Sequence, residues 1–124
     1  MRLEARQSNS IGRRFVTALR RHLPGAFLTP EKKELVALYR LRYRMAMDER
    51  KHDCARIFLE KIMEVDPTDL DARICYAELH HRHLRDFDRA VEQYNKVIRL
   101  AGPANSEAGR RARGGLTELI ELLS

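Results

Sequence analysis

Apolar residues recur at steps of three and four along most of this chain, the spacing that places them on one face of an α-helix. The pattern predicts five helices separated by polar or proline-containing breaks. Their expected ranges are 31–47, 54–65, about 70 to the break at 85–88, 89–100 and 105–123. No stretch alternates between apolar and polar residues for the length of a strand. The pattern therefore predicts an all-α fold.

Capping and helix-breaking residues support these boundaries. Thr29 followed by Pro30 is a typical helix start, with a cap hydroxyl and a proline at the first helical position. Pro67 ends the second helix because proline cannot continue the hydrogen-bond ladder. Gly102-Pro103 ends the fourth in the same way, with glycine just past the helix and proline after it.

The last predicted helix opens at Asn105 or Ser106 and carries a single apolar stripe. Its first half contains Gly109, Gly114 and Gly115. Each glycine weakens a helix by roughly 1 kcal/mol relative to alanine. We therefore expect this helix to depend on packing against the rest of the fold.

The sequence also repeats. A shift of 35 residues aligns the second predicted helix with the fourth. The aligned positions are Ala55 with Ala90, Leu59 with Tyr94, Ile62 with Val97 and, one residue out of step, Pro67 with Pro103. A fixed period in this range indicates stacked helical hairpins, in which a small residue allows two helices to approach and a bulky one fills the space above it.

These residues resemble the tetratricopeptide repeat (TPR) family, whose units carry a small residue, then an aromatic residue or leucine, then an apolar residue and a closing proline. The resemblance covers about residues 31–103, with repeat one at about 31–67 and repeat two at about 68–103. Residues 105–123 are similar to the cap helix of such arrays. The resemblance implies a short α-solenoid of helical hairpins within a domain of residues 29–124.

The first helix of each unit departs from the TPR pattern. No Trp-xx-Leu-Gly-xx-Tyr run is present, and the period is one residue longer than the usual value of about 34. In the second unit the inward positions are either Ile74, Ala77 and His81 or Tyr76, Ala77 and His80. Two repeats are also fewer than the roughly three that such stacks need. The N-terminal segment, the cap helix or a second copy of the chain can supply the missing layers.

The charge of the chain is concentrated at its N-terminus. The 124 residues carry a net charge of +6, and residues 1–30 hold six arginines and one acid. Residues 1–28 therefore form a basic arm, which we expect to be an amphipathic helix. Its apolar arc comprises Ile11, Phe15, Val16, Ala18, Leu19 and Leu23, and its basic residues include Arg13, Arg14, Arg20 and Arg21.

Four roles fit this arm. It can pack its apolar arc on the first repeat, or lie on an anionic membrane surface through its arginines. Contact with a nucleic-acid backbone and a mitochondrial-type targeting peptide are the two further alternatives. No run approaches the roughly 18 apolar residues of a membrane-spanning helix, so none is expected.

The resemblance implies a concave groove, and the candidate groove residues are Arg40, Arg44, Met47, Arg73, Tyr76, His80 and His83. Arg40 and Arg44 are one helical turn apart and can hold one carboxylate together. The alternative for these arginines is a solvated face. The run HHRH (80–83) lacks a second pair of ligands, so no metal site is predicted. In a groove, its histidines would make partner binding sensitive to pH.

Neither cysteine lies in a metal-binding or redox motif. Cys54 and Cys75 fall in predicted helices, where cysteine usually acts as a small buried hydrophobe, and a reducing compartment is expected. No glycine-rich phosphate loop, GxSxG or HExxH motif is present, so no enzymatic activity and no cofactor are predicted.

These observations favour a non-catalytic adaptor or scaffold that binds a peptide, a helix or a partner subunit, with homo-oligomerisation as a further possibility. The alternative is a protein that its basic arm attaches to an anionic membrane surface or, less favoured, to nucleic acid. The predicted location is cytoplasmic, with a membrane-peripheral placement and organellar import as the alternatives.

Overall fold

The structure is a computed structural model that describes residues 28–103 and 105–124. This part of the chain is all-helical, as the sequence predicts, and contains no strand. Its elements are α2 (Pro30–Asp48), α3 (His52–Val65), α4 (Leu70–Leu79), the π-helical segment η1 (His80–Leu84), α5 (Phe87–Ala101) and α6 (Glu107–Leu123). The basic residues Arg13, Arg14, Arg20 and Arg21 lie outside the described residues.

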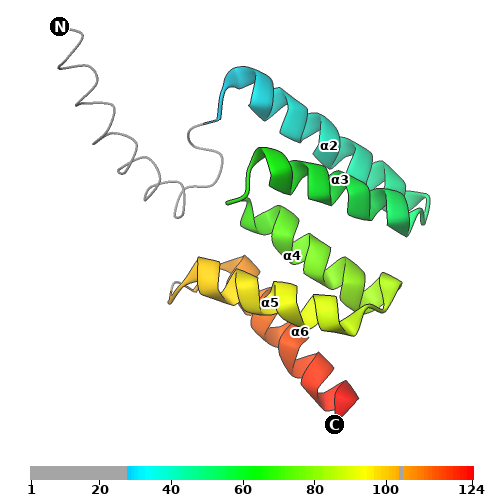
Figure 1. The fold of residues 1–124 in the computed structure, drawn as a ribbon, viewed down its shortest axis with the longest axis vertical. Coiled ribbons are helices and arrows are strands. Elements are labelled where there is room, and N and C mark those ends of the chain that lie inside the picture. Colours follow the sequence, from blue (N-terminus) through cyan, green and yellow to red (C-terminus); the bar gives the residue numbers. More distant parts are fainter. Residues whose placement is uncertain (1–27, 104) are drawn as a thin grey trace, which may run out of the picture.

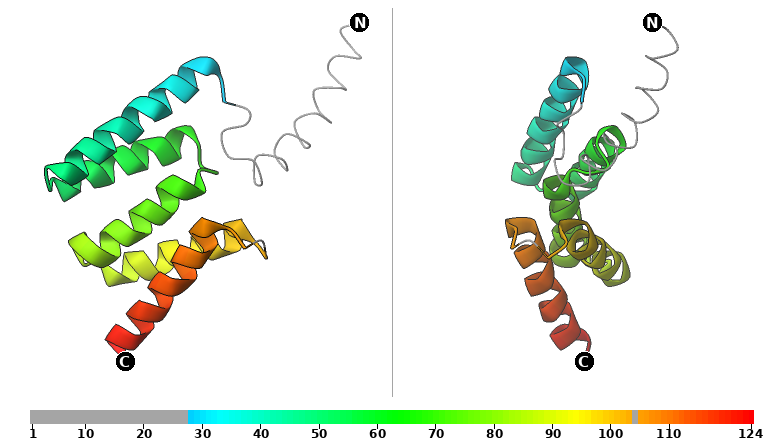
Figure 2. Two further views of the ribbon diagram at one scale, coloured as in Figure 1. Left: turned by 180° about the vertical axis from the view of Figure 1, so that it is seen from behind. Right: turned by 90° about the vertical axis from the view of Figure 1, so that its left-hand side faces the viewer.

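Consecutive helices pack side by side in chain order. α2 contacts α3, α3 contacts α4, and α4 contacts α5, with each helix running back along its neighbour (Figure 1). α6 departs from this ladder because it crosses α5 and contacts α4 as well (Figure 2). The first helix of the second predicted repeat is therefore covered by both α5 and α6.

Side-chain caps define four of the helix starts. The Thr29 hydroxyl accepts a hydrogen bond from the Lys32 backbone N–H at 3.2 Å, and Asp69 accepts one from the Ala72 N–H at 3.0 Å. Asp86 and Ser106 cap α5 and α6 in the same way. Each cap satisfies a donor that the first turn of a helix leaves unpaired. The predicted cap Thr29 is thus confirmed, and of the two residues at which the last helix was expected to open, Ser106 is the cap.

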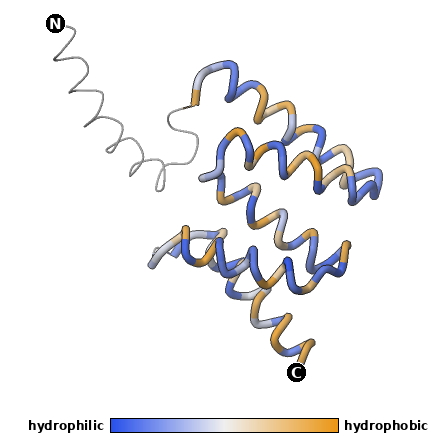
Figure 3. The backbone as a smooth tube through the Cα atoms, in the orientation of Figure 1, coloured by the Kyte–Doolittle hydropathy of each residue, from blue (hydrophilic) through white to orange (hydrophobic). Residues whose placement is uncertain are grey.

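The core consists of two clusters that share α4. One cluster joins α2, α3 and α4, and the other joins α4, α5 and α6. The repeated positions lie in these clusters and are at most 1% exposed: Ala55, Leu59, Ile62, Ala90, Tyr94 and Val97. Figure 3 shows hydrophobic and hydrophilic residues alternating along the helices, as expected for helices that are buried on one side. The 35-residue shift therefore aligns buried residues with buried residues.

The third predicted helix is not one continuous α-helix. α4 ends at Leu79, and the next turn is the π-helical segment η1, which closes at Arg85 with a left-handed φ of 58°. The Asp86 N–H donates to the His80 carbonyl at 3.0 Å across this end. A π-helical turn holds more residues than an α-helical one. It lies inside the interval between Ala55 and Ala90, where the repeat is one residue longer than usual.

We expect Arg40→Ala to lower the free energy of unfolding by about 1 kcal/mol, because Arg40 bridges α2 to the start of α4. Its guanidinium lies 2.5 Å from a carboxylate oxygen of the cap residue Asp69 and 2.6 Å from one of Asp71. The matched control is Arg44→Ala, one turn further along α2, where the side chain is exposed. Its effect is expected to stay within about 0.5 kcal/mol. Urea denaturation measures both, and equal losses would contradict the bridge.

Candidate functional site

A cavity of about 300 Å³ lies between α2, α4 and α6. We call it the groove cavity. Its walls are formed by Tyr43, Met47, Cys75, Glu78, Leu79, Arg82, His83 and Arg111. These residues come from segments far apart in the sequence, so the cavity exists only when the helices are stacked.

The groove cavity combines apolar and charged walls. Met47 and Leu79 are apolar, and Leu79 is fully packed in the core cluster shared by α2, α3 and α4. Arg111 of α6 forms a bidentate ion pair with Glu78 of α4. Its Nε lies 3.1 Å from Oε2, and its Nη2 donates a hydrogen bond to Oε1. This pair raises the pKa of Arg111 and fastens α6 to α4. Most of the charge in this wall is therefore compensated within the protein.

Two further groups in the cavity stay uncharged at neutral pH. Burial raises the pKa of the Cys75 thiol, and the nearby Asp71 raises it further. Burial also raises the pKa of the Tyr43 hydroxyl. The thiolate is the nucleophilic form of cysteine, so these shifts make Cys75 a poor nucleophile. Cys75 and Tyr43 thus act as neutral wall groups rather than as reactive ones.

One end of the cavity is marked by a histidine pair. The rings of His52 and His83 are stacked, with centroids 4.1 Å apart and planes inclined by 19°. Burial lowers the pKa of His83, and His52 lowers it further. Across the described part of the chain, no three His, Cys, Asp or Glu residues come together in a way that could hold a metal ion.

The candidate groove residues divide between two faces of the fold. Met47 and His83 line the groove cavity. Arg40 pairs with the start of α4, and Arg44 is exposed outside the cavity. The other three candidates are buried elsewhere: Arg73 and Tyr76 on another side of α4, and His80 at the start of η1. They face α3 and α5, so the structure does not bring them together with the cavity.

These three buried residues take part in polar contacts between helices. The Tyr76 hydroxyl donates to Glu60 of α3 at 2.8 Å and accepts from Arg89 of α5 at 3.2 Å. The ring of His80 meets that of Tyr76 edge to face at 4.6 Å. Arg73 donates to Gln93 of α5 at 3.1 Å. Their observed role is to connect α4 with its neighbours.

The sequence does not single out most of the cavity residues. Cys75, Glu78 and Arg82 follow one another at steps of three and four, which places them on one face of the third predicted helix. This spacing could have indicated from the sequence that the three residues share a surface. Tyr43 and Arg111 could not be found in this way, because their place in the cavity depends on how α2 and α6 pack against α4.

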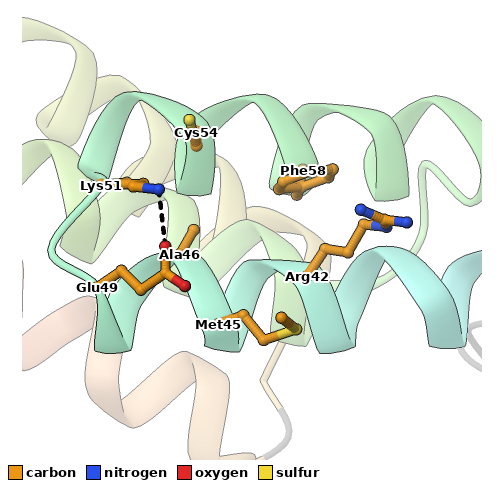
Figure 4. A pocket seen from close by; sticks show the side chains of 7 residues that line it. All are labelled: Arg42, Met45, Ala46, Glu49, Lys51, Cys54 and Phe58. Atoms are coloured by element: carbon orange, nitrogen blue, oxygen red, sulfur yellow. Dashed lines mark ion pairs between the residues drawn. The ribbon is translucent and has the colours of Figure 1, made fainter.

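A smaller cavity of about 190 Å³ lies on the α2–α3 hairpin. Figure 4 shows its lining, which includes the exposed Cys54 and Met45 and the half-buried Phe58. The ion pair drawn there joins Lys51 and Glu49 at 2.8 Å. Only two adjacent helices and their connecting turn form this cavity, whereas three helices converge on the groove cavity.

The buried histidine His80 predicts a loss of stability in acid. Burial lowers its pKa, against an opposing effect of Asp86. Both ring nitrogens are buried without a hydrogen-bond partner among the described residues. Below the ordinary histidine pKa of about 6.5, the unfolded chain therefore binds more protons than the folded one. The contribution of His80 to the free energy of unfolding is constant above that pH and decreases as the pH falls below it.

The test is His80→Phe, which keeps a ring against Tyr76 and removes the titrating group. Urea denaturation at about pH 7.5 and about pH 5.5 gives the loss for each protein. We expect a smaller loss in the variant. Some loss remains, because burial also lowers the pKa values of His81 and His83. An unchanged pH dependence would contradict this role of His80.

Comparison with known proteins does not assign a family. The chain matches no family model, no curated protein and no solved structure. Among the described helices, none combines the length and the apolar character needed to cross a membrane.

Proposed function

We propose that this chain is a non-catalytic helical-repeat module of the TPR type, which binds a protein segment in the groove cavity. The observation that carries the proposal is the convergence of α2, α4 and α6 on one cavity. In a stack of hairpins, these are the first helices of the two repeats and the cap helix. Stacked repeats use such first helices to present a concave binding surface.

The buried triads support the repeat assignment. Ala55, Leu59 and Ile62 occupy the α3 side of one core cluster, and Ala90, Tyr94 and Val97 occupy the α5 side of the other. The two triads lie on α3 and α5, each of which follows a helix that lines the groove cavity, α2 and α4 respectively. The same small–large–apolar spacing therefore packs each pair of helices, as expected for two copies of one hairpin.

The residues that line the groove cavity indicate which kind of protein segment would bind there. Met47 and Leu79 offer contacts for one apolar side chain, and Arg82 and His83 lie at the exposed edge. Arg82 is 3.5 Å from Glu118, at a half-exposed position where a ligand carboxylate can compete for it. We therefore propose a peptide or helix with an apolar anchor next to an acidic residue.

Peptides selected from a random library on the full chain provide the probe. A selected peptide is titrated against the wild type, Met47→Lys and Met45→Lys. Met47 lines the groove cavity, whereas Met45 lies two residues away on an exposed face of the same helix. Because a lysine in the cavity removes the apolar contact, we expect Met47→Lys to weaken binding by about tenfold or more. Met45→Lys should leave it unchanged.

The two cysteines give an independent readout of the same binding. Cys75 lines the groove cavity, whereas Cys54 is exposed on the α2–α3 hairpin. Bound peptide is expected to slow the modification of Cys75 by a thiol reagent and to leave Cys54 unaffected. Equal effects of the two methionine substitutions, or protection of Cys54 alone, would contradict the proposed site.

A further inference from the structure

α2 carries a second apolar stripe that faces away from the core. Leu38, Leu41 and Met45 follow one another at steps of three and four and are 43%, 52% and 51% exposed. The core-facing residues of the same helix, such as Tyr43 and Ala46, lie on its other side. Large apolar side chains at helical spacing on an exposed face indicate a surface that packs against another helix.

Acidic residues extend this stripe at both ends. Glu31 and Glu34 continue the three- and four-residue spacing toward the start of α2, and Asp48 continues it toward the end. All three are exposed, and none forms an ion pair with another described residue. We call the six residues Glu31, Glu34, Leu38, Leu41, Met45 and Asp48 the outer stripe. Its partner is expected to be an apolar face bordered by basic groups.

We propose that residues 11–23 of the same chain cover the outer stripe as a helix antiparallel to α2. This segment has an apolar arc that includes Ile11, Phe15 and Leu19, bordered by arginines and without any acid. As a helix it would be about 20 Å long, which fits within the roughly 28 Å of α2. Six residues, 24–29, connect it to Pro30, a usual length for the turn between two antiparallel helices.

The charges match in this orientation. An antiparallel turn brings Arg20 and Arg21 next to Glu31 and Glu34, because both pairs lie close to the connection. Arg13 and Arg14 come level with about residues 39–40 of α2, well short of Asp48, so the charge match lies at the connected end. A parallel arrangement would remove this match, and six residues cannot return the chain along the full length of α2. Charge and connection length therefore favour the same arrangement.

Hydrogen exchange of the full chain, read from peptides that cover residues 11–23, tests the contact. An isolated helix of this length is barely stable in water, so slow exchange in this segment requires packing. We expect protection in the wild type and its loss, by about tenfold or more, in Leu38→Asp/Met45→Asp. The control is Leu122→Asp, at an apolar position of α6 that is 55% exposed. It should leave the segment protected.

A charge exchange separates this contact from a general effect on α2. The double variant Glu31→Lys/Glu34→Lys is expected to speed hydrogen exchange in residues 11–23. Adding Arg20→Glu/Arg21→Glu to this variant is expected to restore the protection. Exchange of α3 to α6 reports whether the body stays folded in each variant. Lack of protection in the wild type, or lack of rescue, would overturn the proposal.

Sedimentation and vesicle binding test the other occupants of the stripe. A concentration-dependent dimer that Leu38→Asp/Met45→Asp abolishes, with residues 11–23 unprotected, would assign the stripe to a second copy and overturn the proposal. Protection that develops only with phosphatidylglycerol vesicles would assign residues 11–23 to a membrane surface, with the same consequence. Protection in the monomer without vesicles supports it.

Discussion

Replacing Gly115 with alanine is expected to lower the free energy of unfolding by about 1–3 kcal/mol. A Cβ atom at this position would lie 2.5 Å from the hydroxyl oxygen of Tyr94 and 2.7 Å from its Cε1, and closer still to Cζ. Real Cβ atoms do not approach other atoms so closely, so the Tyr94 ring or the α6 backbone must move.

The Tyr94 ring has little freedom to move. It is 0% exposed and fills the centre of the cluster formed by α4, α5 and α6. Its hydroxyl is hydrogen-bonded to Nδ1 of His81 at 2.8 Å, so a shift of the ring also breaks this contact. The loss of packing and of a buried hydrogen bond outweighs the gain of up to about 1 kcal/mol in helix propensity from alanine.

Gly114→Ala is the matched control. No atom lies within 4 Å of a Cβ at this position, which is exposed on the same helix. Only the propensity gain remains, so this variant is expected to be more stable than the wild type by about 0.5–1 kcal/mol. Urea denaturation at one pH compares all three proteins. A stabilising Gly115→Ala would show that α6 does not rest on Tyr94 as described.

Gly114 and Gly115 differ in a way that the sequence does not predict. The sequence predicts that α6 needs tertiary support, because its glycines weaken the helix, and the structure packs this helix against α4 and α5. Propensity alone treats Gly114 and Gly115 as equivalent. They differ only because α6 crosses α5 at Tyr94, a long-range contact that no local pattern contains.

The helices themselves could be predicted because their signals are local. Thr29, Asp69 and Ser106 act as caps within one turn, and the spacing of Ala55, Leu59 and Ile62 marks a buried face without reference to any partner. Each of these signals depends only on residues within one or two turns, so a single sequence is sufficient to detect it.

The groove cavity was harder to predict because α4 is buried on several sides. Its apolar residues do not form one stripe: Ile74 and Ala77 face α5 and α6, whereas Tyr76 faces α3 and α5. The remaining face, with Cys75 and Glu78, lines the cavity. On a helix surrounded in this way, sequence spacing cannot tell which side is open, and the π-helical turn further changes the direction of the residues that follow.

Leu59→Ala is expected to cause the larger loss on α3, about 2–5 kcal/mol, because it removes a fully buried side chain between three helices. Leu59 is 1% exposed and packs in the cluster that contains Ala46, Ala72 and Tyr76. The control, Ile57→Ala, changes a residue of α3 that is 41% exposed, and its loss is expected to be below about 1 kcal/mol.

The variant Leu59→Ala also tests whether packing in the core affects the proposed binding site. Leu59 does not line the groove cavity, but α3 lies between α2 and α4, which provide two of its walls. In cold solution, where the folded form of Leu59→Ala still predominates, the selected peptide is expected to bind with unchanged affinity per folded molecule. Its binding would be lost only in parallel with unfolding. Weaker binding by the folded variant would show that packing around Leu59 determines the shape of the cavity as well as its stability.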